Sequence, residues 1–228
     1  MTPGGDSPEF VENSTYGAPV RGFLHRSRVE GAPGLVLTHG AGANCQSTLL
    51  TAVAEAFWSA GMSVLRCDLP FRQARPHGPP LRSSEKDQDG LKAAVAYLRE
   101  QTSGSIFLGG HSYGGRQASM LAAGEPGLVE AVLLLSYPLH PPQRPEELRT
   151  KHFPDLRTPA MFVSGTCDGF GTIAEMEGAL RLIPARTELL AISGSGHELI
   201  SKKNRAELPG QLSRAFLSFA NQESPVQR

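Results

Sequence analysis

Short, mostly apolar runs alternate with stretches of helical spacing along most of the chain. The runs 34–38 and 63–67 carry few polar residues, and between them Leu49, Val53 and Phe57 recur at the spacing of one helix face. Apolar runs without strict alternation are typical of strands that are buried on both faces. Strands that alternate with helices predict right-handed crossovers and a parallel sheet.

The same alternation continues towards the C-terminus. Further strands are predicted at 105–108, 131–135, 160–163 and 188–192, and helices at 84–98, 116–123, 173–182 and 211–219. Ser84 and Asp87 resemble a capping box that opens the first of these helices. Residues 20–26 are predicted to add an edge strand, and residues 68–82 to form a loop rich in Pro and Arg.

These elements predict an α/β protein with a mostly parallel central sheet and helices on both faces. A length of 228 residues suits a single domain over 1–228, of which about 1–18 is expected to be a less ordered N-terminal segment. On this pattern alone, a flavodoxin-like or a Rossmann arrangement stays open. No G-x-G-x-x-G follows the first strand and no P-loop motif is present, so no nucleotide cofactor is expected.

Charge and cysteine usage exclude several classes of function. The 22 basic and 22 acidic residues cancel, which argues against a nucleic-acid partner. The three cysteines show no C-x-x-C spacing, so neither a disulfide framework nor a metal site is expected. Residues 1–10 do not resemble a signal peptide and no apolar run is long enough to span a membrane, so we expect a cytoplasmic protein.

The pentapeptide 110–114, Gly-His-Ser-Tyr-Gly, carries the clearest chemical signal. It matches G-x-S-x-G, a weak pattern alone, but it lies directly after a predicted strand and before a predicted helix. This strand–turn–helix setting presents Ser112 as a nucleophile at the carboxyl edge of the sheet, and Gly110 and Gly114 leave room for the tight turn.

A serine nucleophile requires a base and an acid that orients the base. His197 follows the last predicted strand through a glycine-rich loop, and Asp168 follows the preceding strand in the same way. The order Ser112, Asp168, His197 therefore predicts a catalytic triad. Asp155 is the alternative acid, although it precedes its strand, while His140 and His152 are less favourable bases.

The small-residue loop 38–44 after the first parallel strand allows a close approach to substrate. We expect one backbone N–H from Ala41 and one from Tyr113 to form an oxyanion hole. His39 is expected to organise this loop by hydrogen bonding rather than to act as the base.

These motifs, with Gly114-Gly115-Arg116 and Gly165-Thr166-x-Asp168, resemble the α/β-hydrolase superfamily over about 20–219. More narrowly, the chain is similar to a compact hydrolase-like family that includes testis-expressed protein 30 and a nonspecific-lethal complex subunit, near the dienelactone hydrolases. The resemblance implies an α/β-hydrolase fold with an eight-stranded type of sheet and the triad above. Dienelactone hydrolases use a cysteine nucleophile, whereas this chain has Ser112.

The connection between the strands 131–135 and 160–163 is short and rich in proline, which predicts no large cap domain. An open site favours a small-molecule partner, a small or polar carboxylic ester, thioester or lactone, cleaved by a serine hydrolase. A non-catalytic interaction module with a vestigial triad is the alternative. Candidate substrate-binding residues are His39, Arg72, Arg116 and His140, together with Arg66, Arg75, His77 and Arg82 at and after the strand 63–67. The alternative is that these side chains are solvated or have structural roles.

Overall fold

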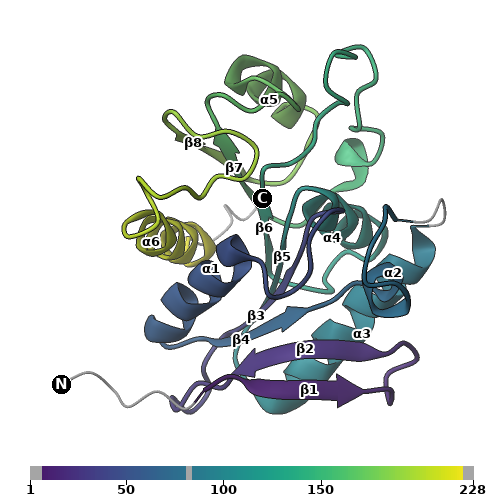
Figure 1. The fold of residues 1–228 in the computed structure, drawn as a ribbon, viewed down its shortest axis with the longest axis vertical. Coiled ribbons are helices and arrows are strands. Elements are labelled where there is room, and N and C mark those ends of the chain that lie inside the picture. Colours follow the sequence, from purple (N-terminus) through teal and green to yellow (C-terminus); the bar gives the residue numbers. More distant parts are fainter. Residues whose placement is uncertain (1–6, 81–83, 223–228) are drawn as a thin grey trace, which may run out of the picture.

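The fold is an α/β-hydrolase fold built on one eight-stranded sheet, seen in a computed structural model that describes residues 7–80 and 84–222 (Figure 1). The strand order is β1-β2-β4-β3-β5-β6-β7-β8, and only the pairs β1–β2 and β2–β4 are antiparallel. The strands are β1 (Glu9–Asn13), β2 (Val20–His25), β3 (Gly34–Thr38), β4 (Ser63–Cys67), β5 (Ile106–His111), β6 (Ala131–Leu135), β7 (Ala160–Gly165) and β8 (Thr187–Ile192).

Helices cover both faces of the sheet, as predicted. They are α1 (Thr48–Ser59), α2 (Pro70–Ala74), α3 (Glu85–Gln101), α4 (Tyr113–Gly124), α5 (Ile173–Leu180) and α6 (Leu208–Ala220), with a 3-10 turn η1 (Phe153–Asp155). Apolar side chains of α1 and α6 share one core with one face of the sheet, and those of α3, α4 and α5 share a second core with the other face. Figure 1 shows α1 beside α6, and α3 and α4 across the sheet from them.

The register of the parallel strands brings their carboxyl ends to one edge. Thr38 at the end of β3 pairs with Cys67 of β4 and with Gly110 of β5, and Gly165 of β7 pairs with Ile192 of β8. The loops that follow these strands therefore lie together, at the edge where open α/β sheets bind their ligands.

The connection between β6 and β7 contains only the turn η1, which confirms the prediction that no cap domain is present. Leu139, Phe153 and Leu156 of this connection are buried in the core that α3, α4 and α5 share with the sheet. The connection therefore packs against the domain instead of covering the sheet edge.

Three local predictions are wrong. Strand β1 lies inside the segment 1–18 that the sequence predicts to be less ordered; residues 20–26 do contain a strand, β2, but it pairs with both β1 and β4, so β1 is the edge. Helix α2 lies inside the predicted loop 68–82, of which Arg82 is outside the described residues. Ser84 does precede α3, but its backbone is already helical and its side chain makes no capping hydrogen bond, and the carboxylate of Asp87 binds groups from other elements.

The three cysteines, Cys45, Cys67 and Cys167, are unpaired. No helix within 7–80 and 84–222 is both long and apolar enough to cross a membrane. In the same part of the chain no group of three or more His, Cys, Asp or Glu side chains is arranged to hold a metal ion.

Candidate active site

Ser112 lies on a strained turn between β5 and α4. Its backbone has φ 51° and ψ −115°, which is unusual for a residue with a side chain and costs on the order of 1–3 kcal/mol. The turn requires small neighbours, because a Cβ on Gly110 would lie 2.6 Å from the carbonyl carbon of Gly114, and one on Gly114 would lie 2.5 Å from the carbonyl oxygen of His39. The glycines therefore allow Ser112 to project from the sheet edge.

A hydrogen-bonded chain connects the three residues that were predicted as the triad. The Nε2 atom of His197 lies 2.8 Å from Oγ of Ser112. The Nδ1 atom of His197 lies 3.0 and 2.9 Å from the two carboxylate oxygens of Asp168. Asp168 has 3% of its side chain exposed and His197 has 20%, so the acid is enclosed while the imidazole remains accessible from the open side.

Two aromatic rings, neither of which we predicted as a contact of His197, fix its position. The ring of Phe170 lies against the imidazole of His197 with the ring centres 4.1 Å apart and 31° between the planes. On another side, His111 donates its Nε2 hydrogen to the backbone carbonyl of His197 at 2.9 Å. Burial lowers the pKa of His111, so this ring remains a neutral donor beside the triad.

The loop after β3 brings Gly40 against Ser112. The carbonyl of Gly40 is bound on its buried side by Nδ1 of His39 at 2.8 Å and by the amide of Ala43 at 3.1 Å. In a trans peptide the N–H points opposite to the carbonyl, so the N–H of Ala41 points away from the buried His39 ring. Because a Cβ on Gly40 would lie only 3.4 Å from the Cβ of Ser112, this peptide lies directly against the nucleophile.

Tyr113 provides the second expected donor at the first position of α4. The first amides of a helix have no partner within the helix and carry its positive end. The phenol of Tyr113 is held away from the open site, because its hydroxyl donates to the carboxylate of Asp87 at 2.7 Å. Asp87 also accepts the backbone N–H of Phe71 at 3.1 Å and is buried, so it joins α2, α3 and α4. We did not predict this link, although an Asp on the buried face of a helix signals such a role.

Neither His39 nor His140 is placed to bind the substrate, contrary to expectation. His39 is fully buried, and both of its ring nitrogens are occupied, because Nε2 accepts the backbone N–H of Leu69 at 3.1 Å. This arrangement agrees with the expectation that His39 organises the loop. His140 is also buried; its Nδ1 donates to the carbonyl of Pro141 at 2.8 Å and its Nε2 lies 3.5 Å from the carboxylate of Glu175.

The prediction that Arg72 binds substrate is also not supported, because all five of its N–H donors contact backbone carbonyls. The guanidinium donates to the carbonyls of Ala41, Ala43, Arg75, Pro76 and Gly78. Arg66 behaves in the same way further along the sheet, with donors on the carbonyl of Cys45 and the hydroxyl of Thr51.

Three other candidates lie away from the triad. The guanidinium of Arg116 is close to Tyr137 and His152. Burial raises the pKa of Tyr137 against the opposing effect of this charge, whereas burial and then the Arg116 charge lower the pKa of His152 to about 4. His152 is hydrogen-bonded to the hydroxyl of Ser119 at 2.8 Å. Asp155, the alternative acid, is exposed at the end of η1.

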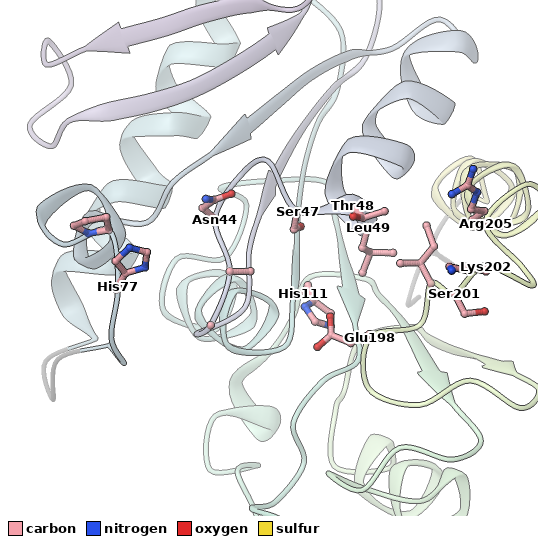
Figure 2. A pocket seen from close by; sticks show the side chains of 14 residues that line it. Asn44, Ser47, Thr48, Leu49, His77, His111, Glu198, Ser201, Lys202 and Arg205 are labelled. Carbon is pink, nitrogen blue, oxygen red and sulfur yellow. The ribbon is translucent and has the colours of Figure 1, made fainter.

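A cleft of about 660 Å³ begins beside the triad (Figure 2). His111 and Glu198, the chain neighbours of Ser112 and His197, lie at its centre. One wall comes from the loop after β3 and the start of α1, and Lys202 and Arg205 lie at the end near α6. Its lining residues are Gly42, Ala43, Asn44, Ser47, Thr48, Leu49, Pro76, His77, His111, Glu198, Ile200, Ser201, Lys202 and Arg205.

A family model for the alpha/beta hydrolase domain matches residues 31–221, which include every element from β3 to α6. The chain belongs to this family. Among solved structures it is similar to a dienelactone hydrolase from Anabaena variabilis, at 24% identity and a TM-score of 0.73, with 93% of this chain and 99% of that chain covered. It is also similar to Est1E from Butyrivibrio proteoclasticus, at 17% identity and a TM-score of 0.75, with 95% and 100% covered. A third similar structure is an alpha-beta serine hydrolase homologue from Coxiella burnetii, at 16% identity and a TM-score of 0.71, with 92% of this chain and 98% of that chain covered. At these identities the likeness establishes the fold, and the family makes the protein a hydrolase by class.

Proposed function

We propose that this hydrolase cleaves a small or polar carboxylic ester, thioester or lactone through an acyl-enzyme formed on Ser112. The observation that carries the proposal is the continuous hydrogen-bonded chain from Oγ of Ser112 through His197 to the enclosed carboxylate of Asp168. A serine hydroxyl becomes an effective nucleophile when an oriented imidazole can take its proton.

In the proposed mechanism, Oγ of Ser112 attacks the ester carbonyl while Nε2 of His197 removes the hydroxyl proton. His197 then returns this proton to the leaving oxygen or sulfur, and a water activated by the same nitrogen hydrolyses the acyl-enzyme. Asp168 keeps the Nδ1 hydrogen of His197 in place and stabilises the imidazolium that forms in each step.

The N–H groups of Ala41 and Tyr113 are the proposed donors to the oxyanion. The orientation of the Gly40–Ala41 peptide and the position of Tyr113 at the start of α4 support this assignment. Such preorganised donors stabilise charge that develops only in the transition state, and each is worth about 10²–10³ in kcat.

The cleft supports a small or polar substrate. Most of the residues that line it are polar, and the β6–β7 connection packs against the domain instead of enclosing an apolar tunnel. A long acyl chain would have to displace water from charged groups such as Glu198, Lys202 and Arg205 without replacing their hydrogen bonds. The similarity to a dienelactone hydrolase, which has the same fold, is consistent with such chemistry.

Labelling with a fluorophosphonate tests the nucleophile. We expect the probe to label wild type once per chain, and Ser112→Ala to abolish both labelling and hydrolysis of p-nitrophenyl acetate. Ser119→Ala is a matched control, because it removes the hydroxyl of a second Ser–His pair with the same 2.8 Å separation that is not on the strained turn. This control should be labelled like wild type.

A panel of p-nitrophenyl esters with increasing acyl length tests the substrate class. We expect kcat/KM to be highest for short acyl groups and to fall as the chain lengthens. Folded wild-type protein that is neither labelled nor active on the panel would contradict the proposal and favour a non-catalytic interaction module.

A further inference from the structure

Arg72 is a buried cation whose donors all point to the backbone. Only 6% of the residue is exposed, and among the described residues no carboxylate forms an ion pair with it. Burying a charged group without a counter-ion is costly unless hydrogen bonds compensate. The compensation comes from backbone carbonyls of two loops, so the guanidinium joins these loops to each other.

One of the two loops carries the proposed oxyanion donor. Nη2 of Arg72 donates to the carbonyl of Ala41 at 2.6 Å and Nε donates to the carbonyl of Ala43 at 2.8 Å. On the other side, Nη1 donates to the carbonyl of Pro76 at 2.8 Å and Nη2 to that of Gly78 at 3.2 Å. Because a guanidinium is planar and rigid, these bonds fix the two carbonyls of the oxyanion loop relative to α2.

The helix that carries Arg72 is itself held by groups near the other proposed donor. The N–H of Phe71, the preceding residue, is bound by Asp87, whose second oxygen accepts the hydroxyl of Tyr113. The N–H of Leu69 is bound by the ring of His39, which also holds the carbonyl of Gly40. Short hydrogen-bonded paths therefore lead from α2 to both proposed donors, the amides of Ala41 and Tyr113.

We infer that Arg72 is a positioning residue that sets the oxyanion hole by binding the carbonyls of Ala41 and Ala43 with the rigid fork of its guanidinium. This inference rests on the proposed function. Arg72 does not touch the substrate; it holds the Ala41–Gly42 peptide, which adjoins the peptide that carries the Ala41 N–H, and so keeps this donor at the distance and angle that the transition state requires. A displacement on the order of 1 Å at such a donor can lower the rate about 10²-fold.

The test compares two substitutions on two substrates. Arg72→Met removes every donor and keeps a similar side-chain length, whereas Arg72→Lys keeps the charge but cannot bind both carbonyls in the same geometry. We expect each variant to lose about 10- to 100-fold in kcat, with KM changed by less than about threefold. The loss should be equal for p-nitrophenyl acetate and for mono-p-nitrophenyl succinate, whose acyl group carries a carboxylate.

If Arg72 instead bound an anionic substrate, KM would rise for the succinate alone and Arg72→Lys would restore much of the affinity. That result would overturn the inference, as would wild-type kcat in both variants. A merely structural role is separated by chemical rescue: added guanidinium, but not ammonium at equal ionic strength, should raise kcat of folded Arg72→Ala. An absence of rescue while thermal unfolding stays cooperative would count against the positioning role.

Arg186→Met is a matched control, because Arg186 also donates to a backbone carbonyl, that of Phe219 at 2.7 Å, at the opposite edge of the sheet. It should lower stability without changing kcat. If the proposed function itself were wrong, wild type would show no hydrolysis that depends on Ser112. The positioning role of Arg72 would then be wrong as well, and this result differs from normal wild-type activity with unchanged kcat in the Arg72 variants.

Discussion

Replacing Asp168 by Asn tests how the triad orders its protons. In the structure, Oδ1 of Asp168 accepts the backbone N–H of Phe170 at 2.9 Å and lies 3.0 Å from Nδ1 of His197, and Oδ2 lies 2.9 Å from the same nitrogen. An Asn that keeps the bond from Phe170 must place its NH₂ group where Oδ2 was. This NH₂ would face Nδ1 where the carboxylate offered a second acceptor, and it would favour the tautomer with its hydrogen on Nε2, facing Ser112, which cannot accept the serine proton.

The magnitude of the loss follows from the same contacts. Turning the amide over restores the active tautomer but sets two donors, the NH₂ of Asn and the N–H of Phe170, against each other in a buried site, at about 1–3 kcal/mol. The neutral amide also gives up the charge-assisted bond to the imidazolium, worth about 1.5–3 kcal/mol. Together these costs correspond to a fall in kcat of roughly two to four orders of magnitude, at about 1.4 kcal/mol per tenfold.

The assay is steady-state hydrolysis of p-nitrophenyl acetate, with thermal unfolding measured alongside to show that Asp168→Asn is folded. KM should change little, because Asp168 has 3% of its side chain exposed, lies behind His197 and does not line the cleft. Asp155→Asn is the control, since it alters an exposed carboxylate on η1 that we considered as an alternative acid. A folded Asp168→Asn variant within tenfold of wild-type kcat, or a comparable loss in Asp155→Asn, would refute the reasoning.

Two further predictions concern the turn and the stability of the sheet. Gly110→Ala should abolish most activity and lower the melting temperature by several degrees, because the new Cβ would lie 2.6 Å from the backbone of Gly114. Gly178→Ala in α5 is the control: a Cβ there meets nothing within 4 Å, so this variant should be more stable than wild type by about 0.5–1 kcal/mol. A loss of activity in Gly178→Ala would contradict the argument. Burial lowers the pKa of His25 in the folded protein to about 4, whereas in the unfolded chain it is about 6.5. Between these two pH values the unfolded chain therefore binds a proton that the folded protein does not, and the free energy of unfolding decreases as the pH falls from about 6.5 to 4. Urea unfolding at pH 7 and pH 5 should therefore show that the free energy of unfolding decreases less for His25→Gln than for wild type. An equal decrease would show that protonation of His25 next to Arg66 does not cause the loss of stability at low pH.

The positions of Ser112, Asp168 and His197 at one edge could be predicted because each follows a recognisable strand, β5 and β7 being buried throughout and β8 closing the sheet. The strand β3 and its neighbours are recognisable as apolar runs, and parallel pairing then places the residues after them together. The local sequence therefore determines which residues lie at the carboxyl edge of the sheet, and the pairing of the strands brings these residues close to one another.

Helix α2 and the role of Arg72 could not be predicted in this way. The helix has five residues in a segment rich in proline, and it depends on the bond from the Phe71 N–H to Asp87 on another helix. Asp87 matched a capping box by spacing, but tertiary partners bind its carboxylate instead. An arginine after a strand suggests an anionic ligand, and only the three-dimensional structure reveals that backbone carbonyls occupy its donors.

The placement of these buried polar side chains has a physical reason. The loop that carries the Ala41 N–H has no strand partner, so its partly buried carbonyls need donors from side chains. His39 and Arg72 supply them, and Asp87 holds the short helix from which Arg72 extends. Burying each of these polar groups costs desolvation energy, which an apolar side chain in the same place would not. An apolar side chain, however, would leave the loop carbonyls without hydrogen-bond donors and the loop free to move. Polar burial at this edge of the sheet therefore stabilises one conformation of an irregular loop, which is the requirement that a preorganised oxyanion hole imposes.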